Sequence, residues 1–294
     1  MADLRDRIGR AVPPVGKRAA RGMTRALASA TSGARALPDF LVIGAQRAGT
    51  TTLYHYLVRH PSIGGAVLDK EIHFFDLAYV EGIDHYRAAF PLRSSLARAE
   101  RRTGVRHLVG EATPYYLFHP LVPERVARDL PDVKLLAVLR DPVDRAWSQY
   151  RHEVDLGYED LSFGEAIDRE ERRLAGEEER LVTEAGSVSF EHQHHSYVAR
   201  GRYAEQLERW YARFPRERLL LVRAEDLFQE PGPVFERVLR FLGVAAWHPA
   251  AWRPYNAASV TTMAPQTRER LRAYFAPWNA RLSELTGTDF GWRA

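Results

Sequence analysis

The chain has 294 residues, 45% of them hydrophobic and 27% charged, so it can bury a sizeable core as one α/β domain or two smaller ones. It contains no cysteine, which excludes disulfides, thiolate metal sites and cysteine nucleophiles and is compatible with a reducing compartment. Its net charge of +4 is concentrated in residues 1–36, which carry eight basic and two acidic side chains. The remaining residues hold 34 basic and 36 acidic groups, so no general field attracts nucleic acid.

Residues 1–37 are predicted to form a basic, flexible arm. The segment is rich in Ala, Arg and Gly, is interrupted by Pro13 and Pro14, and lacks the apolar run of about 7–15 residues that is typical of a signal peptide. A transit peptide is the alternative interpretation. No stretch of the chain approaches the roughly 18 apolar residues of a membrane helix, so we expect a cytoplasmic protein without a membrane span.

From Pro38 onward, short apolar runs alternate with segments of helical periodicity. Strands are predicted at 40–43, 105–109, 133–139 and 219–222, and helices at 51–59, 121–130, 142–155, 201–213, 231–242 and 265–285. Continuous apolar strands separated by helices are typical of a parallel sheet covered on both faces. We therefore predict a single α/β domain over 38–294. Residues 157–195, dense in Glu and Arg, are predicted to form a variable surface helix and loop over the sheet, on the substrate side.

A glycine-bearing loop follows the first predicted strand, where residues 44–51 read GAQRAGTT. Backbone N–H groups at such a loop and at the following helix N-terminus can bind phosphate. The glycine spacing matches the triphosphate loop G-x-x-x-x-G-K-[ST], but Thr50 stands where that loop has its Lys. A kinase needs that Lys and a Mg²⁺ ion, whereas hydroxyl and N–H groups could hold a single 5′-phosphosulfate. A turn without any ligand is the alternative.

A second motif follows the third predicted strand, where residues 139–150 read LRDPVDRAWSQY. Pro142 is a suitable first helical residue and Asp141 a suitable cap. Arg140 ends the strand and so faces the crevice where open α/β sheets bind ligands, and Ser148 lies two turns into the helix. A guanidinium and a hydroxyl together make a phosphate clamp. The alternative is a capped helix with an Asp141–Arg145 pair on its surface.

Together the two motifs resemble those of the sulfotransferases that use 3′-phosphoadenosine 5′-phosphosulfate (PAPS), above all the heparan sulfate glucosaminyl sulfotransferase branch and its bacterial relatives. Further segments match that branch: KEIHFFD at 70–76, GEATPYY at 110–116, VPERV at 122–126, RGRY at 200–203, EDL at 225–227 and the tail at 271–292. The resemblance covers 38–294. It implies the sulfotransferase fold with a phosphate-loop-like sheet, PAPS as co-substrate, 3′,5′-adenosine bisphosphate (PAP) as product, no metal ion, and transfer to a hydroxyl of a carbohydrate or small-molecule acceptor such as a natural product.

The resemblance also implies a role for each matching residue. The 5′-phosphosulfate would be wrapped by the loop residues Arg47, Ala48, Gly49, Thr50, Thr51 and Thr52, and the 3′-phosphate would be held by Arg140 and Ser148. Glu71 would be the general base for an in-line displacement at sulfur, partly buried and with a raised pKa. His73 and Asp76 would lie beside it, orienting the acceptor or tuning Glu71.

Three features depart from the family pattern. Arg47 stands where the family usually has Lys, and because Arg stays protonated we assign it an electrostatic role. Ala112 replaces a Lys of the E-K-T-P segment, which favours a less anionic acceptor. The loop that closes over the nucleotide is not recognisable, and residues 256–264 occupy its place; Trp252 and Tyr255 are candidates for contacts with adenine.

Two other functions compete with this interpretation: a small-molecule kinase of the phosphate-loop class, and a lapsed relative that binds nucleotide without turnover. His192, His194 and His195, with Glu191, suggest a metal site, but their spacing matches no helix-borne ligand motif. A solvent-facing or acceptor-contacting cluster is the favoured interpretation. Nothing in the sequence indicates an oligomeric state.

Overall fold

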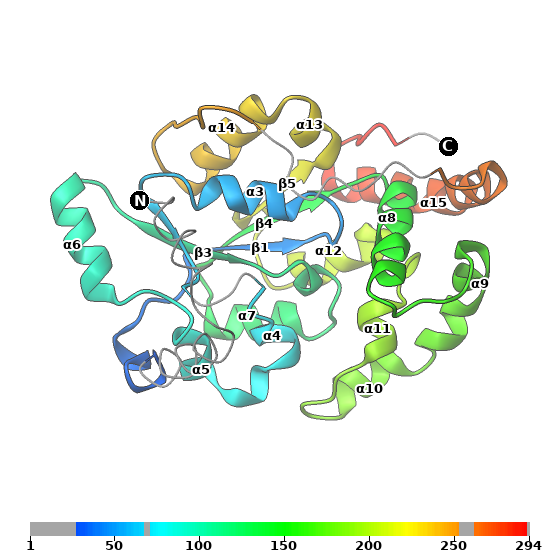
Figure 1. Cartoon of the computed structure of the whole chain (residues 1–294), viewed down its shortest axis with the longest axis horizontal. Coiled ribbons are helices and arrows are strands. Elements are labelled where there is room, and N and C mark those ends of the chain that lie inside the picture. Colours follow the sequence, from blue (N-terminus) through cyan, green and yellow to red (C-terminus); the bar gives the residue numbers. More distant parts are fainter. Residues whose placement is uncertain (1–27, 68–70, 253–261, 293–294) are drawn as a thin grey trace, which may run out of the picture.

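A five-stranded, all-parallel sheet forms the centre of the computed structural model, which describes residues 28–67, 71–252 and 262–292 (Figure 1). The strand order is β2-β3-β1-β4-β5. The strands are β1 (Phe40–Gly44), β2 (Ile63–Gly65), β3 (Leu108–Ala112), β4 (Lys134–Leu139) and β5 (Leu219–Arg223). Every residue of β1 is buried, and so is every residue of β4 after Lys134, as expected of strands covered on both faces.

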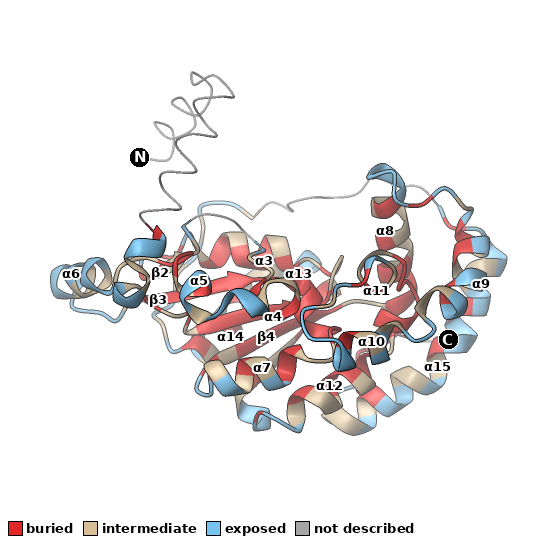
Figure 2. Ribbon diagram, turned by 90° about the horizontal axis from the view of Figure 1, so that it is seen from below, coloured by how far each residue is buried: buried red, intermediate tan, exposed pale blue. Residues whose placement is uncertain are grey.

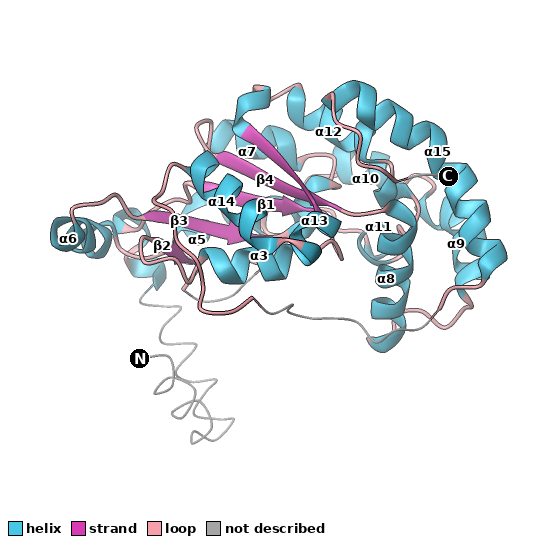
Figure 3. Cartoon of the chain, turned by 90° about the horizontal axis from the view of Figure 1, so that it is seen from above, coloured by secondary structure: helices cyan, strands magenta, loops and turns pink. Residues whose placement is uncertain are grey.

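Helices cover both faces of this sheet (Figures 1 and 3). On one face lie α3 (Thr50–Leu57) and α14 (Pro231–Leu242), with α13 (Ala224–Gln229) beside α14; on the other lie α7 (Val122–Asp129) and α12 (Tyr203–Tyr211). Figure 2 shows the buried strands between these exposed helical surfaces. The long helix α15 (Pro265–Thr286) packs against α12 and α8 (Pro142–Asp155).

The connection between the edge strand β2 and its neighbour β3 contains the helices α4 (Phe74–Leu77), α5 (Ile83–Arg87) and α6 (Arg93–Thr103) and the 3₁₀ turn η2 (Tyr79–Glu81). Past the carboxyl ends of the strands, α9 (Phe163–Leu174), α10 (Glu177–Thr183) and α11 (Phe190–His194) gather beside α8 (Figure 1). Single 3₁₀ turns complete the chain: η1 (Ser32–Ala34), η3 (Pro114–Leu117), η4 (Ala199–Gly201) and η5 (Arg216–Arg218).

The position of β1 in the sheet creates the crevice for the site. β1 pairs with β3 on one side and with β4 on the other, so the sheet grows in both directions from β1. The loops that leave the carboxyl ends of β1 and β4 therefore diverge, and ligands of open α/β sheets bind at such a switch point. The pairing of β1 with β3 is close: a Cβ atom on Gly110 would lie 2.1 Å from the Phe40 ring.

The predicted α/β fold is confirmed, with differences at particular elements. The helices predicted at 142–155 and 231–242 have those bounds, but β3 begins three residues later than predicted, and Val105 is 49% exposed. The prediction missed β2, whose sequence Ile-Gly-Gly has little strand character. It also missed the helices α4, α5 and α6.

The segment 157–195 also differs from the prediction of one surface helix and a loop over the sheet. It forms α9, α10 and α11, and α9 begins at a capping box in which Ser162 and Glu165 bond reciprocally. Phe163 and Ala166 of α9 pack against Val143 and Ala146 of α8, making a second hydrophobic cluster. This packing holds the segment beside α8 rather than over the sheet.

The predicted N-terminal arm is described only from residue 28. The part that is described contacts the domain: Arg35 donates a hydrogen bond to the Phe90 carbonyl at 2.6 Å and forms an antiparallel bridge with Leu92. Residues 1–27 lie outside the described residues.

Candidate active site

The loop between β1 and α3 occupies the crevice. Gly49 precedes the first helical residue, Thr50, and has a φ of 96°, which favours glycine. A Cβ atom there would also lie 2.8 Å from the Phe228 ring, so glycine is required on two grounds. Thr50 and Thr52 are buried. The first N–H groups of a helix lack acceptors within the helix, so α3 presents donors at this loop.

Two guanidinium groups and a hydroxyl meet at this loop. Arg140, at the end of β4, donates a hydrogen bond to the Arg47 carbonyl at 3.1 Å, and Arg47 Nε donates to Ser148 Oγ of α8 at 3.2 Å. Burial and the neighbouring charge of Arg140 lower the pKa of Arg47. The sequence assigned these three residues to one nucleotide site, and they lie together at the carboxyl edge of the sheet.

The helix cap after Arg140 is as predicted, but the predicted alternative, a surface Asp141–Arg145 pair, is wrong. Asp141 accepts hydrogen bonds from the Val143 and Asp144 amides at 2.8 and 3.3 Å. Arg145 is fully buried and donates to Gln149 and to the Tyr197 carbonyl. It therefore supports the junction of α8 with the segment before η4.

Glu71, His73 and Asp76 form a second group at the start of α4. His73 Nδ1 lies 2.7 Å from Asp76 Oδ2, and His73 Nε2 lies 3.7 Å from Glu71 Oε2. Burial by itself would lower the pKa of His73, but the carboxylates of Asp76 and Glu71 outweigh it and raise that pKa to about 10. The ring is therefore an imidazolium at neutral pH, held between two carboxylates.

Glu71 is more exposed than the sequence led us to expect. We predicted a partly buried base, yet 42% of its side-chain surface is accessible, against 28% for His73 and none for Asp76. The group thus extends from the interior to the surface, with Asp76 innermost. Lys70 lies outside the described residues.

Three candidate residues share an uncommon backbone conformation. Arg47, Glu71 and His73 have φ values of 66°, 50° and 52°, and in the described part of the chain they are the only residues other than glycine with positive φ. Such conformations cost free energy, persist only where the surrounding structure imposes them, and cluster at functional sites. This signal cannot be read from the sequence.

A buried carboxyl group below α4 was missed by the sequence analysis. Glu111 of β3 accepts hydrogen bonds from Tyr86 at 2.7 Å and from Thr113 at 3.3 Å. Burial raises its pKa to about 7, although bonds from Tyr86 and Tyr116 oppose that rise. The Tyr116 hydroxyl in turn accepts from the amide of Phe74, next to His73. This network supports the backbone that carries the Glu71 group.

Arg200 was matched to the family pattern, but its role was not foreseen. It is buried beneath α11, where it donates to the carbonyls of His192 and Gln193 at 3.0 and 2.6 Å and also to the Gln46 side chain. Its guanidinium stacks over the Tyr115 ring at 4.8 Å. Arg200 thereby joins α11 to the residue that precedes Arg47.

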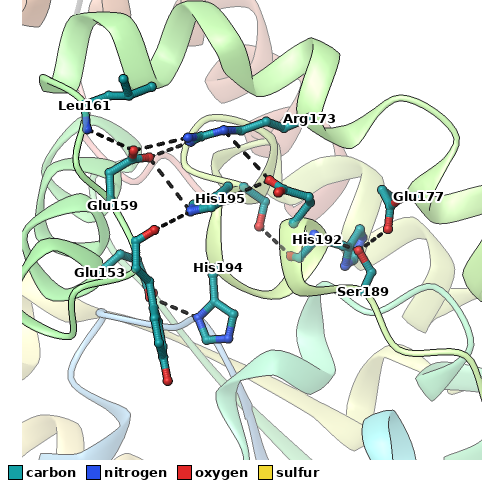
Figure 4. Close-up of polar contacts among 12 residues, drawn as sticks. Glu153, Glu159, Leu161, Arg173, Glu177, Ser189, His192, His194 and His195 are labelled. Atoms are coloured by element: carbon teal, nitrogen blue, oxygen red, sulfur yellow. Dashed lines mark hydrogen bonds and ion pairs between the residues drawn. The ribbon is translucent and has the colours of Figure 1, made fainter.

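The three histidines considered for a metal site have separate partners (Figure 4). His192 is buried and bonds to the Tyr115 hydroxyl at 2.7 Å, His194 pairs with Glu153 at 3.0 Å, and His195 pairs with Glu191 at 2.6 Å. Burial lowers the pKa of His192 to about 2. No group of three or more His, Asp or Glu side chains among the described residues could hold a metal ion.

Other predicted features lie elsewhere or outside the described residues. Trp252 packs edge-to-face on Tyr56 at 4.7 Å, while Tyr255 and residues 256–261 are not among the described residues. A pocket of about 440 Å³ opens at the opposite, amino-terminal edge of the strands, lined by the Arg106–Asp39 and Arg218–Asp132 pairs. Within the described residues, no helix combines the length and apolarity needed to cross a membrane.

Comparison with known proteins assigns this architecture to a family. A family model described as a sulfotransferase domain matches residues 37–252. The chain is similar to the membrane-associated sulfotransferase kil1 of Dictyostelium discoideum, with 28% identity over 87% of this chain and 67% of that protein. It is also similar to heparan sulfate glucosamine 3-O-sulfotransferase 3B1 of Mus musculus, with 28% identity over 89% of this chain and 66% of that protein. The chain thus spans about two thirds of the length of these relatives.

A solved structure supports the same assignment. The fold is similar to that of a sulfotransferase from Alicyclobacillus acidocaldarius, with a TM-score of 0.65 and 34% sequence identity. The similarity covers 88% of this chain and all of that one.

Proposed function

Because the chain belongs to the sulfotransferase domain family, we propose that it transfers a sulfuryl group from PAPS to a hydroxyl of a carbohydrate or small-molecule acceptor. The observation that supports this most strongly is the cluster of Arg47, Arg140 and Ser148 at the carboxyl edge of β1 and β4. It brings Arg47 of a phosphate-binding type of loop together with two residues that lie 93 and 101 positions away.

The charges of this cluster fit a doubly anionic donor. Two guanidinium groups held side by side repel each other, and the lowered pKa of Arg47 reflects burial together with that repulsion. An anion between them would relieve the repulsion, and guanidinium groups bind phosphate oxygens in a planar, bidentate manner. In the proposal, Arg140 and Ser148 take the 3′-phosphate, and Arg47 with loop residues 48–52 takes the 5′-phosphosulfate.

PAPS, when bound, supplies the sulfuryl group and departs as PAP. Glu71 accepts the proton of the acceptor hydroxyl, help that is typically worth about 10²–10⁴ in rate. The acceptor oxygen forms a bond to sulfur while the bond from sulfur to the bridging oxygen breaks, and its electron pair leaves with the phosphate. Arg47 stays protonated throughout and stabilises the charge that grows there.

The imidazolium of His73 serves to position Glu71 in this scheme. Asp76 holds one ring nitrogen at 2.7 Å, and the other nitrogen faces the Glu71 carboxylate. A ring that is protonated at neutral pH cannot accept the hydroxyl proton itself. This supports Glu71 as the base and His73 as the group that orients it.

A phosphate-loop kinase fits these observations less well. Such an enzyme needs a strand-borne carboxylate for Mg²⁺. Among the described strands only β3 carries a carboxylate, Glu111, and hydrogen bonds from Tyr86 and Thr113 engage both of its oxygens. Thr50 also counts against a kinase, because it stands where such a loop has the Lys that binds the β/γ-phosphates.

The test has two stages. In a thermal-shift assay, PAP should stabilise the protein and ATP with Mg²⁺ should not. A ligand present at 100 times its Kd raises the free energy of unfolding by about 2.7 kcal/mol. Single-turnover transfer from labelled PAPS to a panel of glycosides and phenols should then fall at least tenfold in Glu71→Gln. The matched control is Glu81→Gln, an exposed carboxylate in η2. Stabilisation by ATP alone would favour a kinase, and binding of PAP without transfer would indicate a lapsed relative.

A further inference from the structure

Three rings from two segments meet at the surface beside α8. Tyr158, just after α8, is 45% exposed, and Phe190, at the start of α11, is 48% exposed; their ring centroids are 5.3 Å apart. The ring of His194 lies 4.7 Å from Tyr158 and 4.5 Å from Phe190. Single exposed apolar residues are ordinary, whereas rings that touch one another at the surface present a flat apolar face on which a ligand ring can stack. We refer to Tyr158, Phe190 and His194 as the ring cluster.

The ring cluster is held in place by its backbone and by a carboxylate. The Tyr158 amide donates to the Glu153 carbonyl at 2.8 Å, and the Tyr158 carbonyl accepts from His195 at 2.9 Å. His194 Nδ1 lies 3.0 Å from Glu153 Oε2, and Figure 4 shows these two side chains pointing toward each other. The surface is therefore preformed, which reduces the entropy cost of binding.

The ring cluster is joined to the phosphate loop by two routes. Arg200 binds the Gln193 carbonyl and the Gln46 side chain, so α11 and the residue before Arg47 share one anchor. Glu153, on the last turn of α8, is close enough to Arg47 for its charge to raise the pKa of that guanidinium, against the lowering by burial and by Arg140. The two elements that carry the cluster, α11 and the end of α8, are thus both linked to the loop that would hold the phosphosulfate.

The charges around the ring cluster are acidic. Glu159 and Asp160 follow Tyr158, Glu191 follows Phe190, and Glu153 and Asp155 lie on the last turn of α8. Arg173 pairs with Glu159 at 2.5 Å and with Glu191 at 3.8 Å. The segment 157–195 as a whole carries eleven carboxylates against four arginines, although Asp168 and Glu178 pair with Arg270 and Arg209 outside it. Ala112, where the family pattern has Lys, is fully buried and apolar. The guanidinium groups at the crevice, Arg47 and Arg140, are assigned to the donor. An acceptor rich in sulfate or carboxylate would meet like charge here, which raises its free energy of binding.

Glu153 gives a second indication of what binds. It is fully buried, and its Oε1 atom has no hydrogen-bond partner in the part of the chain that the structure describes. Buried carboxylate oxygens need donors. The buried charge of Glu153 therefore adds to the carboxylates at this end of α8, and together they suit a ligand with hydroxyl or ammonium groups rather than further carboxylates.

We propose that the ring cluster is the acceptor subsite, taking an uncharged or cationic acceptor with a flat apolar face, such as an aryl glycoside. The rings stack on that face, as aromatic pairs do, and the acceptor hydroxyl is thereby directed toward Glu71. The inference rests on the proposed function and specifies its acceptor. It makes Tyr158 and Phe190 determinants of specificity for an acceptor that is not a polyanion.

Equilibrium binding tests the inference separately from catalysis. With PAP present, calorimetry should give Kd values for 4-nitrophenyl glycosides of glucose, galactose and N-acetylglucosamine and for the matching methyl glycosides. We expect Phe190→Ala and Tyr158→Ala to weaken binding of the 4-nitrophenyl compounds about tenfold and that of the methyl compounds less than about twofold. Phe190→Trp should retain affinity. Tyr274→Ala, which removes a 41% exposed ring on α15, is the matched control.

Each outcome decides for or against the ring cluster. Equal losses of affinity for aryl and methyl glycosides would mean that the rings stabilise the fold and do not bind the aryl group. No loss of affinity for either class would mean that the rings do not touch the acceptor. Tighter binding of 4-nitrophenyl glucuronide or of an N-sulfated heparin oligosaccharide than of the neutral glycosides would also overturn the inference. If the ring variants behave as expected but labelled PAPS gives no sulfated product, the proposed function fails while the subsite stands.

Discussion

Replacing Asp76 by Asn should lower the pKa of His73 from about 10 to about 7 or below. In the native chain, burial lowers the pKa of His73, and the carboxylates of Asp76 and Glu71 raise it. Asp76, at 2.7 Å and inaccessible to solvent, is the closer of the two, whereas Glu71 is at 3.7 Å and 42% exposed. Without the charge of Asp76, burial dominates and favours the neutral imidazole.

The size of the effect follows from the shift itself. From 6.5 to about 10 is between three and four pKa units, and each unit corresponds to about 1.36 kcal/mol. Because 28% of the His73 side chain is exposed, solvent screens part of this interaction energy. We therefore take its contribution to the free energy of unfolding as about 2 kcal/mol. A raised histidine pKa stabilises the fold fully below pH 6.5, and the stabilisation is lost as pH rises toward 10. The native chain should lose this 2 kcal/mol between neutral pH and about pH 10, while Asp76→Asn should not.

Two measurements check the prediction. NMR of chain labelled at its 11 histidines follows the titration, with His73→Gln assigning the signal. Thermal melts should show Asp76→Asn about 4 °C less stable at pH 7 and the two chains converging near pH 10. Glu236→Gln is the matched control, because Glu236 pairs with the half-exposed His248 at 3.2 Å and its loss should change little. A native His73 that titrates at or below pH 7 would refute the reasoning, and so would parallel pH profiles.

Arg140→Ala should weaken PAP about 100-fold by calorimetry, because its guanidinium would be the principal donor to the 3′-phosphate; a loss below fivefold would remove it from the site. Arg47→Ala should lower single-turnover transfer by about 10²–10³, whereas Arg47→Lys, which restores a cation, should retain most of it. Gly110→Ala should destabilise the fold by about 3 kcal/mol in denaturant melts, since its Cβ would lie 2.1 Å from the Phe40 ring, and Phe40→Leu in addition should recover part of that loss. The raised pKa of Glu111 makes the fold lose stability as pH rises from 4.5 through about 7, so Glu111→Gln should flatten stability profiles in that window.

The sequence predicted those parts of the fold and the candidate site that depend on local signals. The helix from Pro142 was predictable because Asp141 caps it and proline starts it. The meeting of Arg47 and Arg140 was predictable because the carboxyl ends of parallel strands share one edge of the sheet. Neither inference needed knowledge of which side chains touch across the molecule.

The remaining features depend on contacts between distant residues. Glu111 and Tyr86 are 25 positions apart, and nothing in the sequence indicates that they meet, yet the Tyr86 hydroxyl donates a hydrogen bond to Glu111 in the core. Arg200 bonds to Gln46 across 154 positions. The exposure of Glu71 was misjudged for the same reason, since burial depends on the elements that surround a residue rather than on its neighbours in sequence. Tertiary packing decided these cases where propensity and pattern carried no information.

Two departures from the family pattern, Arg47 and Ala112, have related effects on how charge is distributed between the donor and acceptor sides of the proposed site. In the proposed site Arg47 keeps a cation on the donor side. Burial and Arg140 lower its pKa, but a guanidinium in a protein stays protonated. On the other side, Ala112 stands where the family pattern has Lys, and the carboxylates of Glu153, Asp155, Glu159, Asp160 and Glu191 flank the ring cluster. Arg200 links α11, which carries part of that cluster, to the phosphate loop. A site that holds its positive charge over the donor and surrounds the acceptor with carboxylates attracts the nucleotide and discourages a second polyanion. Acceptor choice would then be set by the segment between α8 and α11, where the chain combines exposed rings with acidic groups, rather than by the loops proposed to bind PAPS.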